Sequence, residues 1–320
     1  MKPCTLGPDE KIAEPGLYAI PLERHHSQPC EGFSVTSGVL RTMELGTPAD
    51  VWAFHRLNPA RFEKEETDAL RLGIAMALYV EGGPNRVLEA FELHADDKPR
   101  KPTKPQIAAY DAGRASDAAI ASVEYWRKVD ADPQSYLTRA ELDEICAMGA
   151  VLERDPNASV VMRGMPEVTM AWQDEATGIW VLSRPDVISL EPSVIDYKKM
   201  AVRGGYFSGH VVDRRIDDGG YLQQIALGAE GFERLTGEWP KLTGIVAQLG
   251  SPPYHVITRA MDEEDLRIAQ FQNRRALNRI HECLTSGHWP GPGEVVGSYW
   301  MRKEHRERLL NEMNMEGKAP

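Results

Sequence analysis

The segment from Ser183 to Lys198 constrains the fold most, because it places charged residues within two short and otherwise apolar strands. In the second strand, residues two apart share a face, so Asp196 and Lys198 should project together while Tyr197 points the other way. A tight turn separates this strand from the first, which begins near Asp186. We therefore expect a hairpin that brings Asp186 alongside Asp196 and Lys198.

This group of charged residues has a catalytic interpretation and a structural one. Two carboxylates held close together repel each other unless a cation neutralises them, and Mg²⁺ prefers such oxygen ligands with some positions left to water. Lys198 could then orient an attacking water or stabilise charge on a phosphate, as in phosphodiester hydrolysis. In the structural interpretation Asp186 is a turn residue, and Asp196 and Lys198 lie on a solvated strand face. The motif in isolation favours the structural interpretation, and its context favours the site.

Short strands and longer helices are expected around this hairpin. Alternating apolar residues and turn signals such as Glu191–Ser193 predict an antiparallel meander over Glu167–Gln173, Ile179–Arg184, Val187–Leu190 and Val194–Lys199. Farther along the chain we expect a helix, two strands and a long helix, over Gly220–Leu235, Leu242–Leu249, Tyr254–Thr258 and Asp262–Leu284.

The part of the chain before the meander is expected to be helical. A first helix should begin at Ser37, and further helices should span Ala49–Leu57, Thr67–Val80, Ile107–Val129 and Arg139–Arg154. Thr138, followed three residues later by Glu141, is typical of a capping box at the start of the last of these helices. Strands flanked by helices on both sides indicate an α/β or α+β core with an N-terminal helical elaboration.

Three regions follow from this pattern. Residues 1–150 should form a helical region packed on the core, residues 151–295 the core itself, and residues 296–320 a helical tail. The segment Ala95–Gln106 combines three prolines with four basic residues, so we expect an exposed loop. It is either a solvated linker, which we favour, or an arm that touches DNA phosphates.

Composition limits the class of protein. The formal net charge of −11 argues against a protein that coats nucleic acid nonspecifically, although a local basic channel remains compatible with it. The four cysteines are far apart and suggest neither a zinc site nor disulfides, and the histidines lack a metal-ligand spacing. No apolar run is long enough for a membrane helix and the N-terminus lacks a signal-peptide pattern, so we expect a cytoplasmic protein.

The charged hairpin resembles the signature of the PD-(D/E)XK nuclease superfamily. Pro185-Asp186 matches its first half, and Asp196-Tyr197-Lys198 matches its second. Because this signature is degenerate, we sought the motifs that accompany it in family members. The resemblance implies a restriction-endonuclease-like core, in which helices flank a central mixed sheet.

Further motifs resemble those of RecE-like phage exodeoxyribonucleases, the exodeoxyribonuclease VIII type. Upstream of the hairpin, Pro166-Glu167-Val168-Thr169 resembles an acidic strand of that family. Tyr221-Leu-Gln-Gln224-Ile-Ala226 resembles a Y-x-x-Q-x-A helix, Leu72-Gly73-Ile-Ala75 an L-G-T-A helix, and Trp289-Pro290-Gly291 a W-P-G turn. In order and spacing these motifs cover roughly residues 35 to 295.

The resemblance implies a metal-dependent exonuclease that acts on the ends of linear duplex DNA. Its Mg²⁺, for which Mn²⁺ can substitute, would be held by Asp186 and Asp196, with Glu167 and Tyr197 as further members of the metal set. Lys198 would assist the water and Gln224 would position the site. The resemblance also implies a ring-shaped homo-oligomer that feeds a single-strand annealing recombinase during phage-type recombination.

Two departures from the family keep other functions open. Ala77 and Gly228 stand where the family often has a histidine and a tyrosine. The missing histidine implies slower cleavage, weaker binding of one metal, or recruitment of another ligand such as Glu81 or Glu167. Alternatives are a nuclease of the same fold that selects single strands or particular structures, and a weakened module that binds DNA or docks a partner. Arg184 is expected either to bind a DNA phosphate or to pair with a nearby carboxylate.

Overall fold

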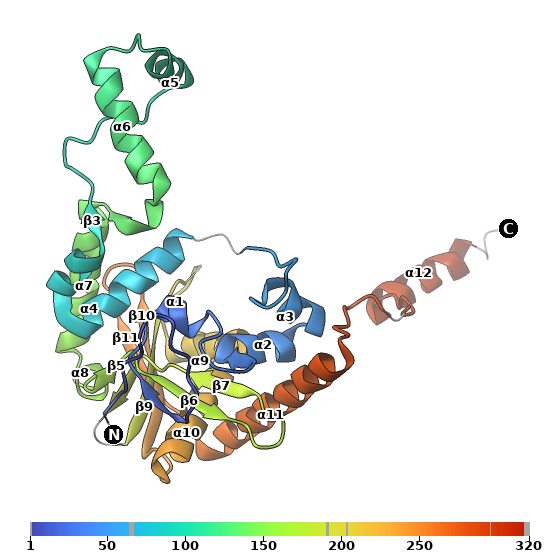
Figure 1. The fold of residues 1–320 in the computed structure, drawn as a ribbon. Coiled ribbons are helices and arrows are strands. Elements are labelled where there is room, and N and C mark those ends of the chain that lie inside the picture. Colours follow the sequence, from blue (N-terminus) through green and yellow to red (C-terminus); the bar gives the residue numbers. More distant parts are fainter. Residues whose placement is uncertain (1, 64–66, 190–191, 203, 295, 317–320) are drawn as a thin grey trace.

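The protein combines helices with two mixed β-sheets, the α/β class of architecture that the sequence predicts (Figure 1). The computed structural model describes residues 2–63, 67–189, 192–202, 204–294 and 296–316. Leu190 and Glu191, predicted as a strand end and the start of a turn, lie outside the described residues. Among the described residues, no helix has the length and apolar character needed to cross a membrane.

The first sheet has four strands, in the order β1 (Gly16–Tyr18), β6 (Thr169–Gln173), β7 (Trp180–Ser183) and β2 (Ser34–Thr36). β6 pairs antiparallel with β1 and β7, whereas β2 runs parallel to β7. The N-terminal region, predicted to be helical, thus also supplies two edge strands. Each has only three residues, too few for an alternating pattern to stand out in the sequence.

The second sheet has five strands, in the order β11 (Val256–Ala260), β10 (Leu242–Leu249), β9 (Ser193–Met200), β8 (Val187–Ser189) and β5 (Met165–Pro166). β9 and β10 are parallel, and the other neighbours are antiparallel. β9 is the middle strand and carries Asp196 and Lys198. The charged motif therefore lies on a strand that is hydrogen-bonded along both edges.

The predicted meander of four short strands is wrong in one respect. β5 continues into β6, and β7 continues into β8, as two long paired strands that bend at the same place. Pro166 faces Val187, and one residue further along the same register the Glu167 amide donates to the Asp186 carbonyl. Glu167 has a φ of 54° and Pro185 has no N–H to donate, so here the hairpin leaves one sheet and enters the other. Alternation of apolar and polar residues cannot reveal such a bend, because the strand segments on both sides of it keep the expected pattern.

Most predicted helices are present with similar bounds: α2 (Ser37–Leu45), α3 (Pro48–Phe54), α7 (Arg139–Arg154), α10 (Tyr221–Thr236) and α11 (Glu263–Ser286). The end predicted for the helix over Thr67–Val80 is wrong, because α4 (Asp68–Ala90) resumes after non-helical residues at Gly82 and Gly83 and continues to Ala90. Thr138 and Glu141 form the predicted capping box of α7. Short helices α1 (Leu22–His25) and α8 (Ala158–Val161) complete the body. α9 (Gly209–Gly219) was not predicted.

The helix predicted over Ile107–Val129 is wrong, because two helices occupy this region. They are α5 (Lys104–Asp111) and α6 (Asp117–Ala131), separated by Gly113 with a φ of 67°. α5 also takes the last residues of the predicted loop, whose preceding part, 95–103, is mostly exposed as expected. The 3-10 turn Pro133–Ser135 follows, and β3 (Glu92–Leu93) pairs with β4 (Tyr136–Leu137) beside it.

Helices cover both faces of the second sheet. α4 and α7 pack on the face that carries Val187, Ile195 and Val246. α9, α10 and α11 pack on the opposite face, which carries Ile245 and Ala247. Alternation along β9 places Asp196 on the second of these faces, beneath α10.

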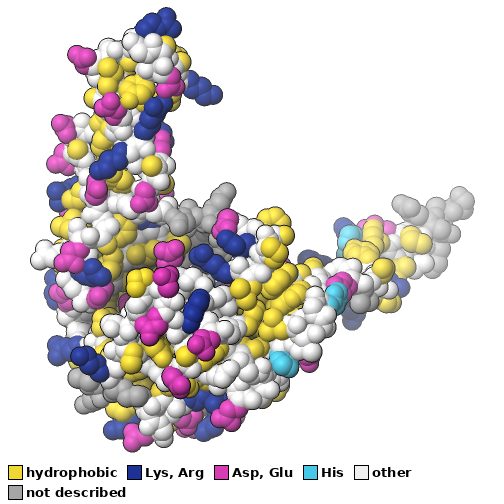
Figure 2. Space-filling view, in the orientation of Figure 1, with side chains coloured by type: hydrophobic (Ala, Val, Ile, Leu, Met, Phe, Trp, Pro, Cys, Tyr) yellow, Lys and Arg dark blue, Asp and Glu magenta, His cyan; other side chains and the backbone are white. Residues whose placement is uncertain are grey.

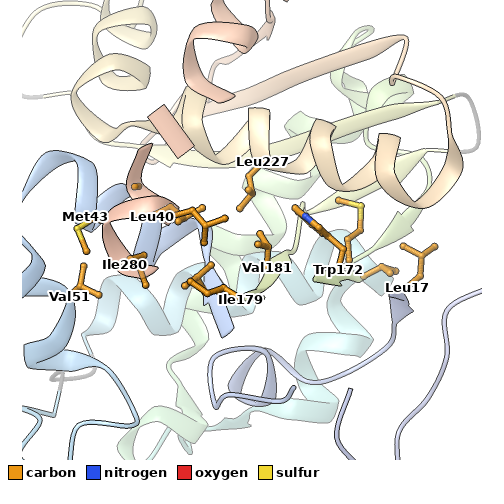
Figure 3. Close-up of a cluster of buried hydrophobic side chains, with 14 of the residues drawn as sticks. Leu17, Leu40, Met43, Val51, Trp172, Ile179, Val181, Leu227 and Ile280 are labelled. Atoms are coloured by element: carbon orange, nitrogen blue, oxygen red, sulfur yellow. The ribbon is translucent and has the colours of Figure 1, made fainter. Parts of the chain in front are cut away.

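α10 also packs on the first sheet, so it lies between the two sheets. There Leu227 of α10 and Ile280 of α11 meet Trp172, Ile179 and Val181 of the sheet, in the cluster shown in Figure 3. Both sheets thus bury apolar residues against the same helix. The position of α10 decides how its side chains meet β9.

Two segments extend from this body in Figure 1: the arm, which is α5 and α6 with their connections (residues 94–135), and the helix α12 (Lys303–Glu316). No described residue of the arm belongs to the hydrophobic clusters of the body. Figure 2 shows basic and acidic side chains intermixed over the arm, where Lys101 pairs with Asp130 at 3.0 Å.

Candidate active site

β9 presents Asp196 and Lys198 on one face and Tyr197 on the other, as the strand period predicts. Asp196 is 1% exposed, and the Lys198 ammonium forms an ion pair with its Oδ2. On the opposite face, the Tyr197 hydroxyl donates to Gln248 Oε1 at 2.7 Å. The charged pair is therefore buried beneath α10, and the alternative of a solvated strand face is wrong.

Asp186 joins this pair from the neighbouring strand. Val187 pairs with Ile195, which places Asp186 opposite Asp196 just beyond the end of β8. The Tyr197 backbone N–H donates to Asp186 Oδ2 and anchors the carboxylate at this position. The hairpin thus brings Asp186, Asp196 and Lys198 together as expected.

The protein environment makes the charged form of Asp186 unfavourable. Burial raises the pKa of Asp186 well above its usual range, and the neighbouring charges of Asp196 and Glu167 raise it further. Lys198 and the Tyr197 N–H oppose this effect only in part. Burial lowers the pKa of Lys198, but Asp196 and Asp186 outweigh it, so the net shift is upward and Lys198 stays protonated. With both carboxylates ionised, this group of three has one negative charge in excess.

These residues fit a divalent cation bound through oxygen. Asp196 Oδ2 is buried and pairs with the Lys198 ammonium, the one cation that contacts it among the described residues. The excess negative charge of the two buried carboxylates costs free energy unless further positive charge reaches them. The described residues hold no cluster of three His, Cys, Asp or Glu side chains arranged around a metal position. The two carboxylates would therefore need main-chain oxygen and water as additional ligands, which Mg²⁺ accepts.

Glu167 lies at the bend of the hairpin, next to Asp186 but engaged elsewhere. Arg184 Nε donates to Glu167 Oε2 at 2.6 Å, and Arg184 also donates to the carbonyl of Ile20. Of the two roles considered for Arg184, the structure therefore shows pairing with a carboxylate. Glu167 would have to leave this ion pair to approach a metal.

Gln224 reaches the site from α10, the helix that lies over β9. Its Nε2 donates to Asp196 Oδ1 at 2.9 Å, so Gln224 contacts one oxygen of this carboxylate and Lys198 the other. α10 comes so close to β9 that a Cβ at Gly228 would lie 2.7 Å from Val194 Cγ1. This packing leaves no room at position 228 for a side chain larger than that of glycine.

Tyr221, one turn before Gln224, was seen in the sequence only as part of a motif. Its ring centroid lies 5.2 Å from Lys198 Nζ, a cation–π distance. The available signal was helical spacing, since residues three apart share a face and Gln224 was already assigned to the site. The ring therefore contacts the lysine that the sequence singled out.

Glu81, which the sequence offered as an additional metal ligand, does not enter the site, and neither does the buried His25. Glu81 is exposed on α4 and pairs with Arg86 at 3.2 Å. His25 is buried, its Nδ1 lies 3.0 Å from Thr169 Oγ1, and burial lowers the pKa of its imidazole well below the usual value. His25 is therefore a neutral hydrogen-bonded core residue.

Comparison with known proteins shows a shared fold. No protein-family model matches this sequence, and no curated protein matches it. The structure is similar to a crystal structure from Eubacterium rectale described as a "Putative exonuclease", with a TM-score of 0.56 and 16% sequence identity. The alignment covers 88% of this chain and 96% of the other. The predicted fold class, helices around a mixed sheet in a nuclease-like α+β arrangement, is thereby confirmed.

Proposed function

We propose that this protein is a metal-dependent deoxyribonuclease that hydrolyses phosphodiester bonds at Asp186, Asp196 and Lys198. The observation that carries the proposal is a pair of neighbouring buried carboxylates beside a single protonated lysine, which pairs with Asp196 and leaves the charge of Asp186 unbalanced. Structural ion pairs also perturb pKa values, but a second carboxylate buried beside such a pair is costly unless further positive charge reaches it. A fold shared with a protein described as an exonuclease adds support.

Asp186 and Asp196 would hold Mg²⁺ or Mn²⁺, and the Tyr197 carbonyl can be a further ligand. In a strand, the N–H and C=O of one residue face the same neighbour, and the Tyr197 N–H faces Asp186. Glu167 is a possible additional ligand once released from Arg184. A bound divalent cation would lower the pKa of water and neutralise charge on the phosphate.

The side chains around the carboxylates have separate roles. Lys198 is protonated and its side chain is 19% exposed. It can therefore stabilise negative charge that develops on a phosphate oxygen. The Gln224 amide holds the orientation of Asp196, because it donates to Oδ1 and fixes Oδ2 on the side of Lys198. Gln224 therefore acts through Asp196.

Linear duplex DNA is the substrate that we propose, with cleavage starting from ends. The motif resemblance to RecE-like exonucleases supports this choice, and so does the description of the structural relative. Assembly into a ring and delivery of DNA to an annealing recombinase are further parts of the proposal. A nuclease of the same fold that selects single strands would have the same metal centre.

The test is digestion of end-labelled linear duplex DNA with Mg²⁺ or with EDTA. We expect metal-dependent loss of label, and a rate at least about 100-fold lower for Lys198→Ala and Asp196→Asn. Glu282→Gln, an exposed carboxylate of α11, is the control and should digest DNA like the parent. Closed circular duplex and single-stranded DNA, tested in parallel, separate end-dependent from strand-selective cleavage. Equal digestion by parent, Lys198→Ala and Asp196→Asn would refute the assignment.

A further inference from the structure

Arg41 of α2 is partly buried and lacks the carboxylate partner that two more deeply buried arginines have. Arg71 and Arg184, whose side chains are 8% and 10% exposed, each pair with a glutamate at 2.6 Å. Within the described part of the chain, Arg41 pairs with no carboxylate and donates from Nη1 to the Gly219 carbonyl at 3.0 Å. Its Nε is buried without a hydrogen-bond partner. A buried N–H of a charged group costs free energy when it has no acceptor. This guanidinium is therefore suited to an anionic ligand.

Arg41 is linked to the candidate active site through the ring of Tyr221. Arg41 Cζ lies 5.5 Å from the centroid of this ring, and Lys198 Nζ lies 5.2 Å from the same centroid. One aromatic side chain thus contacts two cations, from α2 and from β9. Asp196 neutralises Lys198, whereas no acidic side chain among the described residues neutralises Arg41.

The local backbone allows Arg41 to lie across the start of α10. Gly220 precedes the helix with a φ of 59°, and a Cβ there would lie 3.3 Å from Arg41 Cδ. No side chain caps this end of α10, so the positive end of the helix dipole adds to the charge of the guanidinium. The chemistry of the position favours a phosphate, because the planar guanidinium presents a fork of donors that matches phosphate oxygens.

We propose that Arg41 binds a phosphate group of DNA adjacent to the one that is cleaved, and that Tyr221 is a positioning residue for Arg41 and Lys198. This inference rests on the proposed nuclease function and names the part of the substrate that reaches beyond the carboxylates. The geometry that carries it is the Tyr221 ring, which contacts both the Arg41 guanidinium and the Lys198 ammonium, together with the buried Arg41 Nε that has no acceptor.

The first experiment measures binding of a fluorescent duplex by anisotropy in EDTA, over a series of salt concentrations. Arg41→Gln should weaken binding roughly tenfold and reduce the salt slope by about 1, as expected for the loss of one phosphate contact. Arg41→Lys keeps the charge and loses the fork, so it should retain the slope with intermediate affinity. Arg154→Gln, an exposed arginine at the end of α7, removes the same charge and should bind like the parent.

A second measurement tests the role of Tyr221 through the cleavage rate at saturating DNA. Tyr221→Leu removes the ring and should lower both affinity and this rate, because Arg41 and Lys198 lose their common contact. Tyr221→Phe keeps the ring and should restore both. If Tyr221→Phe and Tyr221→Leu are equally impaired while both remain folded by circular dichroism, the positioning role is wrong.

The remaining outcomes separate this inference from the proposed function. If Arg41→Gln binds DNA as tightly as Arg154→Gln, the phosphate site is overturned and the nuclease assignment stands. If the parent neither binds nor cleaves DNA, both proposals fall. Duplexes with 5′-phosphate and 5′-hydroxyl ends identify the source of the phosphate. If Arg41→Gln loses the same affinity for both duplexes, Arg41 contacts a backbone phosphate. If it loses affinity only for the duplex with 5′-phosphate ends, Arg41 contacts a terminal phosphate.

Discussion

At the scale of single residues, Asp186 is where the structure and the proposed chemistry conflict most clearly. Burial and the charge of Asp196 disfavour its ionised form, yet a metal ligand must be ionised. The metal-free protein therefore holds a proton at Asp186 more tightly than its unfolded chain does. Its contribution to stability is present at low pH and lost as the pH rises through the raised pKa.

Replacement of Asp186 should therefore stabilise the metal-free protein while it removes the activity. Asp186→Asn should melt at a higher temperature than the parent in EDTA at pH 8, and the difference should shrink as the pH falls toward 5. Calorimetry at several pH values measures this. Mg²⁺ should raise the melting temperature of the parent and leave that of the variant unchanged. Equal melting temperatures of the two proteins in EDTA across this pH range would contradict the raised pKa of Asp186.

Gln224 gives a second prediction at this scale. Gln224→Leu removes the donor to Asp196 Oδ1 and should weaken Mg²⁺ binding roughly 10–100-fold, since groups that orient metal ligands contribute about this much. The measurement is the Mg²⁺ concentration that gives half-maximal cleavage. Gln270→Leu, a partly exposed position of α11, is the matched control. An unchanged Mg²⁺ requirement would show that Gln224 is only a packing residue.

Single residues also show what the sequence can reveal about the site. The shared face of Asp196 and Lys198, with Tyr197 on the other, follows from the period of a strand. The partner of Arg184 and the contact between Tyr221 and Lys198 do not follow, because each joins residues more than 15 positions apart in the chain. Such contacts depend on how sheets and helices pack, which no local pattern records.

At the scale of elements, α10 determines how closely the two sheets approach each other. Helix periodicity predicted its existence and bounds. Its close approach to both sheets became apparent only in the structure, where a Cβ at Gly228 would lie 2.7 Å from Val194 of β9 and one at Gly231 would lie 2.5 Å from the Trp172 ring of β6. The break at Gly113 was missed for a related reason, since the residues on both sides of it keep a helical pattern.

Gly228→Ala should destabilise the protein although alanine favours helices. Its Cβ would lie 2.7 Å from Val194 Cγ1, and overpacking of this kind typically costs about 1–3 kcal/mol. Gly73→Ala is the matched control within α4, because a Cβ there meets nothing within 4 Å. It should stabilise the protein by about 0.5–1 kcal/mol. Denaturant unfolding measures both, and a Gly228→Ala protein as stable as Gly73→Ala would contradict the packing described for α10.

At the scale of the whole molecule, the arm is separable from the body. β3 and β4 pair at its base, so the chain leaves and re-enters the body at neighbouring points. Replacement of residues 96–133 by a short Gly-Ser linker should leave the melting temperature within a few degrees of the parent, since no arm residue enters the body's clusters. If DNA binding falls in this variant while stability holds, the arm contacts substrate. A large loss of stability would show that the arm supports the fold.

The bent hairpin makes the rest of the molecule indivisible. One pair of strands belongs to both sheets, and the residues at its corner include Glu167, Arg184 and Asp186. A break of the chain at this corner would separate the sheets and dismantle the carboxylate pair in one event. The protein therefore cannot be split into complementing halves along its sheet boundary. During divergence, insertions should accumulate at the arm and the tail and be excluded from the corner.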